Sequence, residues 1–314
     1  MTPEVIAFGE PMLEFNAVEP GSLREVHGYH AGYGGDTSNF AIAASRMGSQ
    51  VGYLCRLGDD DFGRNFLDLW QSEGIDTRHV VLEKGSVTGI YFVARTGSSH
   101  SFLYYRQDSA ASHFSSRDIP EQYLRSARVF HSSGISQAIS NSACDAVFHA
   151  IDVARQAGVL VSYDPNLRPR LWGVRRARAI ILETIGLSDF VFPSLEDAQL
   201  LTGLEDPEAI ADLLLARGPQ MVALKLGSGG VLLATPQGRR VFPVQPVEVT
   251  DTTGAGDTFA GAFVSCYLQG KSLEECAQWA NAAASLTTTG WGAVNPIPGL
   301  GAVKKLLDLD LKTV

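Results

Sequence analysis

Short apolar runs of strand character recur along the chain and alternate with segments of helical periodicity. The runs occupy 4–8, 51–55, 127–131, 159–163, 189–192 and 221–226, and the clearest helical patterns occupy 36–47, 141–157 and 272–286. Strands that alternate with helices pair into a largely parallel sheet with helices on both faces. The sequence therefore predicts a three-layer αβα sandwich whose ligands bind at the carboxyl ends of the strands.

Two stretches interrupt this alternation. Residues 86–108 form two alternating runs around TGSSH, which indicates a β-hairpin, and residues 15–33 are extended, polar and glycine-containing. We expect both to form a small β-sheet lid beside a core made of 1–14, 34–85 and 109–314. Tyr104 and Arg106 would share one face of the hairpin, because side chains alternate along a strand. The pattern fits a lid over a ligand and a dimer contact equally well.

Composition excludes several classes of function. The chain has 314 residues, 45% of them hydrophobic, and a net charge of −9 with no Lys/Arg run longer than a pair. Nucleic-acid binding needs clustered cations, so we expect none. Apolar runs are too short to span a membrane, and the N-terminus lacks a signal-peptide pattern, so the prediction is a cytoplasmic protein. Four cysteines without CxxC spacing predict buried free thiols, and the scattered histidines predict exposed side chains.

The stretch DTTGAGDTF, residues 251–259, joins an extended segment to a helical pattern. Its Gly-Ala-Gly sequence lets backbone approach a ligand closely, and the N–H groups of a helix N-terminus attract anions. Asp257 follows this loop, where a carboxylate could accept the proton of an attacking hydroxyl. A capped helix without a ligand explains the same residues, so the pattern alone leaves both interpretations open.

Other polar groups precede helices or follow strands. Gly34 and Gly35 come before a helical pattern with Asp36 and Asn39 in its first turn, as a simple turn and cap would also require. The segment DPNLRPRLW (164–172) leaves a strand at its carboxyl end and carries two arginines, and KLGSGG (225–230) also follows a strand. Neither a P-loop, a GxGxxG fingerprint nor an HExxH motif is present, which argues against a P-loop enzyme or a dehydrogenase.

Together these motifs resemble the ribokinase-like (PfkB) family of carbohydrate kinases along essentially the whole chain. The resemblance rests on DTTGAGDTFAGAF near the C-terminus and on GGDTSNFAIAASRMG and VGYLCRLGDDDFG near the N-terminus. Within the family, GYGGDTSN, FLYYRQDSAAS, SSGISQAIS and DPNLRPRLW are most similar to 2-keto-3-deoxygluconate kinases. The resemblance implies an ATP- and Mg²⁺-dependent kinase that phosphorylates the terminal hydroxyl of a sugar acid. Kinases of neutral ketoses such as fructose, and a non-catalytic sugar-sensing protein, are the alternatives.

The resemblance also implies a role for particular residues. Asp257 would be the catalytic base, with the amides of Gly254, Ala255 and Gly256 as the anion hole. The sugar would be bound by Gly34, Gly35, Asp36, Asn39, Tyr91, Tyr104, Arg106 and Arg168, the two arginines contacting its carboxylate. The nucleotide would be bound by Ser194, Lys225, Gly227, Gly230, Gly254 and Gly256. Asp197 would approach the metal through water, a monovalent cation such as K⁺ is left open, and the lid implies a homo-oligomer.

Two segments depart from the family pattern. The Asn-x-x-Glu motif near the magnesium is replaced here by Ser194, Leu195, Glu196 and Asp197. In some 2-keto-3-deoxygluconate kinases an acidic residue near the C-terminal end also contacts the sugar. The corresponding segment here, TTGWGAVNPIP (288–298), contains no acid.

Overall fold

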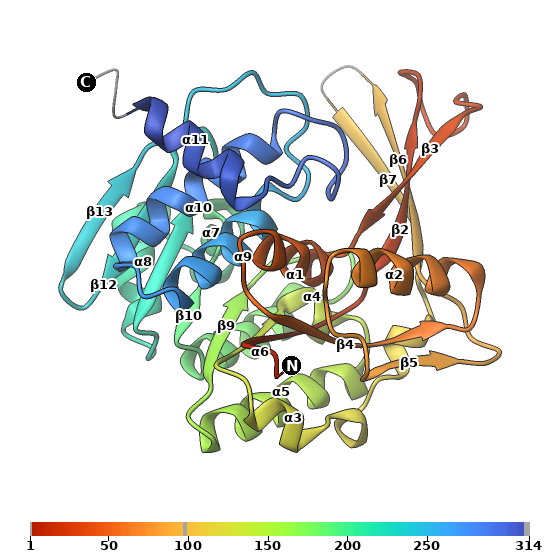
Figure 1. Cartoon of the computed structure of the whole chain (residues 1–314), viewed down its shortest axis with the longest axis horizontal. Coiled ribbons are helices and arrows are strands. Elements are labelled where there is room, and N and C mark those ends of the chain that lie inside the picture. The colour runs from red at the N-terminus through yellow and green to blue at the C-terminus, as the bar shows by residue number, and fades with distance from the viewer. Residues whose placement is uncertain (1, 97–98, 311–314) are drawn as a thin grey trace.

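The computed structural model describes residues 2–96 and 99–310, and within them a nine-stranded sheet forms the centre of the molecule (Figure 1). In spatial order its strands are β13 (Gly238–Phe242), β12 (Val231–Thr235), β11 (Met221–Lys225), β10 (Phe190–Val191), β9 (Leu160–Asp164), β8 (Val129–Ser133), β1 (Val5–Phe8), β4 (Val51–Gly58) and β5 (Val80–Glu83). The pairs from β11 to β5 are parallel, whereas β12 and β13 add an antiparallel edge. Each of the six predicted runs lies in the parallel part.

Helices cover both faces of this sheet, which confirms the predicted αβα sandwich (Figure 1). Alternate side chains of β1 separate the two cores, because Val5 and Ala7 enter one hydrophobic cluster while Ile6 and Phe8 enter another. The first face carries α1 (Asp36–Arg46), α2 (Asp61–Ser72), α9 (Ala255–Leu268), α10 (Leu273–Thr287) and α11 (Leu300–Asp310). The second carries α3 (Glu121–Arg125), α4 (Gly134–Ala138), α5 (Asn141–Gln156), α6 (Val174–Gly186), α7 (Leu195–Thr202) and α8 (Pro207–Leu215).

The contact between α1 and α9 fixes the position of the residues discussed below. Gly261 permits an unusually close approach, because a Cβ there would lie 2.5 Å from the carbonyl oxygen of Phe40. Residues four apart on a helix share a face. Asp257 therefore lies one turn before Gly261 on the same side of α9, next to Asn39 on α1.

A second, four-stranded sheet stands apart from the helix-covered one (Figure 1). Its order is β3 (Tyr29–Gly34), β2 (Met12–Ala17), β6 (Ile90–Thr96) and β7 (Ser99–Tyr105), with β2 and β6 parallel and the other pairs antiparallel. The small sheet and its β6–β7 hairpin agree with the sequence, although part of the predicted turn, 97–98, lies outside the described residues. The division into core and lid at the expected residue boundaries stays a prediction.

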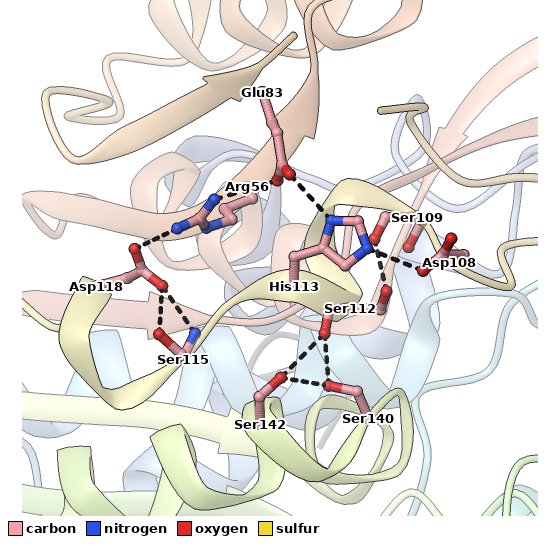
Figure 2. Close-up of polar contacts among 10 residues, drawn as sticks. All are labelled: Arg56, Glu83, Asp108, Ser109, Ser112, His113, Ser115, Asp118, Ser140 and Ser142. Atoms are coloured by element: carbon pink, nitrogen blue, oxygen red, sulfur yellow. Dashed lines mark hydrogen bonds and ion pairs between the residues drawn. The ribbon is translucent and has the colours of Figure 1, made fainter. Parts of the chain in front are cut away.

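The chain that leaves β7 is fastened to the edge of the large sheet (Figure 2). It passes through Asp108, at φ 60°, into the 3₁₀ turn η1 (Ala110–His113). The His113 ring lies between two carboxylates, with Nε2 2.9 Å from Asp108 Oδ1 and Nδ1 3.0 Å from Glu83 Oε1. Hydrogen bonds to Asp108 and Glu83 raise the pKa of His113. Glu83 is itself paired with Arg56 at 3.2 Å, so the network ties the small sheet to β4 and β5.

The predictions from composition hold for the cysteines and fail for one histidine. All four cysteines are free and buried. In the part of the chain that the structure describes, every helix is too short or too polar to cross a bilayer. The expectation of exposed histidines is wrong for His131 on β8, which is 2% exposed. Its ring stacks on Phe40 at 3.5 Å and lies 2.8 Å from Ser162 Oγ, and burial holds its pKa well below the usual value.

Candidate active site

The Gly-Ala-Gly loop forms the N-terminus of α9. Gly254 adopts φ 76°, and a Cβ there would lie 2.8 Å from the carbonyl oxygen of Ala293, so only glycine fits. Ala255 and Gly256 form the first turn of the helix, where the Ala255 amide donates to the Thr252 carbonyl at 3.3 Å. No described side chain caps this helix. Asp257 lies inside the first turn and does not cap the helix, so a side-chain cap does not explain this sequence. The N–H groups at this helix end are suited to bind an anion.

Asp257 is held against α1 by one hydrogen bond. Asn39 Nδ2 donates to Asp257 Oδ2 at 2.8 Å, as the close packing of the two helices requires. Burial, together with the nearby charge of Asp36, raises the pKa of Asp257 from 3.8 to about 7. A carboxylate with a pKa near neutrality is well matched to accepting a proton from a hydroxyl.

Asp36 lies beside Asp257 at the start of α1. Its Oδ1 accepts the Thr37 amide at 2.9 Å, and its Oδ2 accepts Asn166 Nδ2 at 2.8 Å. Burial raises the pKa of this carboxyl group as well. Asn166 adopts φ 33° in the loop after β9, an uncommon conformation for a residue other than glycine. Two acids with raised pKa values therefore face the same space.

The two glycines before α1 are required by close contacts. Gly35 adopts φ 101°, and a Cβ there would lie 2.6 Å from the carbonyl oxygen of Glu10. A Cβ on Gly34 would collide with the hydroxyl of Tyr91. The Tyr91 ring stacks on Tyr104 with centroids 5.6 Å apart. The structure thus brings Gly34 together with Tyr91, and Tyr91 together with Tyr104.

The two arginines expected to share a carboxylate have different partners. The Arg106 side chain is 9% exposed and forms a salt bridge with Glu10, whose side chain is 1% exposed. Arg168 is exposed in the loop after β9 and donates to the Leu167 carbonyl at 3.0 Å. Its charge acts on Asp36, lowering a pKa that burial raises. Arg168 is therefore close enough to act on the carboxylate of Asp36, whereas Arg106 already has a buried counter-ion in Glu10.

The residues expected at the nucleotide follow β10 and β11. Ser194 is the N-cap of α7, accepting the Asp197 amide at 3.1 Å, and it forms a β-bridge with Lys225. Asp197 Oδ2 accepts the Leu167 amide at 3.1 Å, and burial raises its pKa. Glycine is required at Gly230, at φ 90°, where a Cβ would lie 2.9 Å from Pro243 Cα. Gly227, at φ 57°, begins the 3₁₀ turn η3 (Gly227–Gly229).

This geometry can be set beside known proteins. Residues 2–300 match the family model for pfkB family carbohydrate kinases. The chain belongs to the PfkB family. It is 36% identical to a 2-dehydro-3-deoxygluconokinase from Thermoproteus tenax, covering 96% of this chain and 94% of the relative, and 34% identical to fructokinase-1 from Oryza sativa subsp. japonica, covering 97% of each. A protein from E. coli solved in complex with ATP and Mg²⁺ superposes with a TM-score of 0.91 at 26% identity, covering 98% of this chain and 99% of that one.

The protein is therefore a carbohydrate kinase, and the non-catalytic alternative falls away. Relatives of two substrate classes are similarly close, so family membership fixes the reaction class and leaves the sugar open. The E. coli neighbour was solved with Mg²⁺ as well as ATP, which raises the question of where a metal ion could bind in this chain. Within residues 2–96 and 99–310, no group of three or more His, Cys, Asp or Glu side chains could hold an ion by itself. Mg²⁺ characteristically binds one or two carboxylates together with water and phosphates, which fits the carboxylate of Asp197.

Sequence reasoning missed two buried acidic residues of this PfkB site. Asp164, at the end of β9, accepts a hydrogen bond from Lys225 Nζ at 2.6 Å. Glu14, on β2, is 1% exposed and accepts a hydrogen bond from Tyr91, and burial raises its pKa to about 7. Both are lone acids within or directly after apolar runs. That pattern could have indicated them, because buried carboxylates require a specific partner.

The loop 288–298, which contains no acid, contacts both the small sheet and the segment before α9. Asp251 Oδ2 accepts the amide of Gly292 at 3.1 Å, while its Oδ1 accepts the amide of Thr253 at 3.0 Å. Trp291 lies under the guanidinium of Arg95 on β6, 3.7 Å from the ring centre. The loop therefore connects the small sheet to the turn that leads into α9.

Proposed function

We propose that the protein uses ATP and Mg²⁺ to phosphorylate the terminal hydroxyl of a sugar acid, 2-keto-3-deoxygluconate, giving its 6-phosphate. The observation that carries the acid specificity is Arg168, an exposed guanidinium at the carboxyl end of β9 within electrostatic reach of Asp36. A guanidinium binds a carboxylate bidentately. The 36% identity to the Thermoproteus tenax relative supports the same choice.

In this proposal Asp257 is the general base. The sugar hydroxyl transfers its proton to Asp257 and attacks the γ-phosphorus in line, while the N–H groups at the start of α9 hold the transferring phosphoryl group. Asn39 keeps the carboxylate oriented through its 2.8 Å hydrogen bond. Bound Mg²⁺ would offset the charge of the phosphates, with Asp197 near it. Gly34, Gly35 and the stacked tyrosines Tyr91 and Tyr104 would surround the sugar.

The small sheet is proposed to act as a lid and as an oligomer contact. Within the sheet, Tyr91 contacts Gly34, the last residue of β3, and stacks on Tyr104. Because α1 begins two residues after Gly34, closure of this sheet over the start of α1 would exclude water from the phosphoryl group. Its outer strand, β7, has exposed side chains at Leu103 and Tyr105. An edge strand with exposed apolar side chains is a ready pairing surface for a second copy. A cytoplasmic location and use of a monovalent cation stay predictions.

A kinase of neutral ketoses is the second candidate, and one observation favours it. Arg106 is already neutralised by Glu10, so one of the two cations expected for a substrate carboxylate is occupied. The rice fructokinase, at 34% identity, is nearly as similar as the 2-dehydro-3-deoxygluconokinase. In this alternative, Arg168 would lie at the site entrance without a substrate charge to bind.

The two candidates are separated by kcat/KM for 2-keto-3-deoxygluconate and for fructose in wild type, Arg168→Met and Arg170→Met. Arg170 is an exposed arginine of the same loop and serves as the matched control. We expect wild type to prefer the acid and Arg168→Met to lower its kcat/KM by about 10- to 100-fold, the worth of a hydrogen-bonded charge. Fructose turnover and the Arg170→Met variant should change little. Equal wild-type values, or an acid preference that survives Arg168→Met, would contradict the proposal.

A further inference from the structure

The ammonium group of Lys225 lies where three elements of the site meet. Lys225 ends β11, and its Nζ donates to Asp164 Oδ2, at the end of β9, at 2.6 Å. The side chains are 18% and 7% exposed, respectively. The same Nζ would be 3.1 Å from a Cβ placed on Gly256, in the first turn of α9. A mostly buried cation thus adjoins the turn whose N–H groups are suited to an anion.

The short strand between the two partners explains how they meet. β10 pairs with both β9 and β11 but ends at Val191. Asp164 and Lys225 therefore approach each other across its end. A buried ion pair is weak support for a fold, because desolvation of the two charges offsets most of their attraction. The stability of the fold therefore does not by itself explain a lysine at position 225, and we look for a functional role.

Lys225 also acts on the proposed base. Its charge lowers the pKa of Asp257, opposing the burial and the Asp36 and Asp164 charges that raise it. Among the described residues that act on Asp257, Asn39 donates a hydrogen bond to it, Asp36 and Asp164 oppose its ionisation, and Tyr91 lies within range of its charge. Lys225 and the Asn39 amide favour the ionised base.

We propose that Lys225 is a catalytic residue of this kinase, whose ammonium leaves Asp164 to contact the transferring phosphoryl group, and that Asp164 is the positioning residue that holds it beforehand. In the step the sugar O–P bond forms, the bond from the γ-phosphorus to the bridging oxygen breaks, and ADP departs. The hydroxyl proton passes to Asp257, and Lys225 keeps its own proton throughout. The inference rests on the proposed role of Asp257 and extends it with the cation that balances the developing charge.

The test compares Lys225→Met, Lys225→Arg and Asp164→Asn. Lys225→Met should lower kcat by about 10²–10³-fold, as the loss of one charge-stabilising group does, and should move the acidic limb of the pH–kcat profile to higher pH, because Asp257 loses the cation that lowers its pKa. Lys225→Arg should regain part of the rate. Asp164→Asn, which keeps the cation, should stay within about tenfold of wild type and shift the limb to lower pH.

Binding measurements supply a readout independent of turnover. Calorimetric titration with ADP plus aluminium fluoride, a mimic of the transferring phosphoryl group, should weaken far more in Lys225→Met than titration with the β,γ-imido analogue of ATP, since the contact forms in the transition state. Neither ligand transfers a proton, so a failure of Asp257 as base would leave this result unchanged. Conversely, loss of the proposed base function alone would appear in Asp257→Asn.

A structural role for the pair predicts a different outcome. Lys225→Met would then lower thermal stability, while kcat stayed within about threefold, the pH limb stayed in place and both ligands weakened equally; that combination overturns the proposal. If Lys225→Met does not fold because Asp164 is left buried without its counter-ion, the double variant Lys225→Met/Asp164→Asn removes both charges. Near-wild-type kcat in the double variant would also overturn it.

Discussion

Replacing Asp257 by Asn should stabilise the protein while abolishing most of its activity. Burial raises the pKa of this carboxyl group from 3.8 to about 7 in the folded protein. Each pKa unit corresponds to about 1.4 kcal/mol, so ionising Asp257 costs the folded state about 4 kcal/mol relative to the unfolded chain. Asp36 shares part of this cost, because two neighbouring buried carboxylates resist ionising together, and we expect a net gain of about 2–4 kcal/mol from the substitution.

The sign and the pH window follow from proton linkage. Below about pH 4 both states hold the proton and the group contributes nothing. As the pH rises toward 7, the unfolded chain ionises while the folded protein does not, so stability falls and then stays level above pH 7. Asn cannot ionise and avoids this loss. Urea unfolding at pH 8 should therefore show Asp257→Asn as more stable than wild type, with the gap reduced to about 1 kcal/mol at pH 4.5.

Activity and a matched control complete this experiment. Asp257→Asn should lower kcat by about 10²–10⁴-fold, the usual contribution of a general base, and wild-type kcat should rise with pH through about 7. Asp68, an exposed carboxylate on α2, is the control, and Asp68→Asn should change neither quantity. The reasoning is refuted if Asp257→Asn gains no stability at pH 8, or if it keeps more than half of the wild-type kcat.

Two further predictions concern the Gly-Ala-Gly loop and the small sheet. Gly256→Val would place a side chain against Lys225 Nζ, where a Cβ alone would already lie at 3.1 Å. We expect ATP turnover to fall far more than the melting temperature, and unchanged turnover would show that no anion binds there. Tyr105→Lys, on the exposed edge strand β7, should convert an oligomer to monomers in sedimentation experiments. A wild-type protein that sediments as a monomer at all concentrations would contradict the oligomer.

The sequence predicted the architecture because the pattern that encodes it is local. Runs such as 51–55 are apolar and short, and the helices between them have recognisable ends, as at Gly270 after α9, with φ 83°. The Gly-Ala-Gly loop was also recognisable, since Gly254 sits at a position where a side chain cannot fit. Backbone constraints of this kind can be recognised in a single sequence, because they require glycine at particular positions.

Partnerships between distant residues leave no such trace. The family resemblance paired Arg106, on the hairpin, with Arg168, after a core strand, but the buried partner of Arg106 is Glu10, far away in the chain. The arginines of DPNLRPRLW drew attention, whereas Asn166 between them and the strand is the residue that contacts Asp36. Similarly, no residue near His131 in the sequence predicts that its ring stacks on Phe40. Charge balance in a buried site depends on which elements meet, and only the folded structure determines that.

The parallel pairing of β2 with β6 has a consequence for how the protein is made. Leu13 pairs with Ile90, and between them the chain builds α1, β4, α2 and β5. Neither hairpin, β2–β3 or β6–β7, is stable alone, because an isolated two-stranded hairpin is marginal in water. During synthesis the first hairpin must therefore wait for the second to emerge, and pairings of such long sequence separation form slowly. The surface proposed to receive the sugar is consequently completed late in folding, and an unpaired β2 is open to pairing with other chains until then.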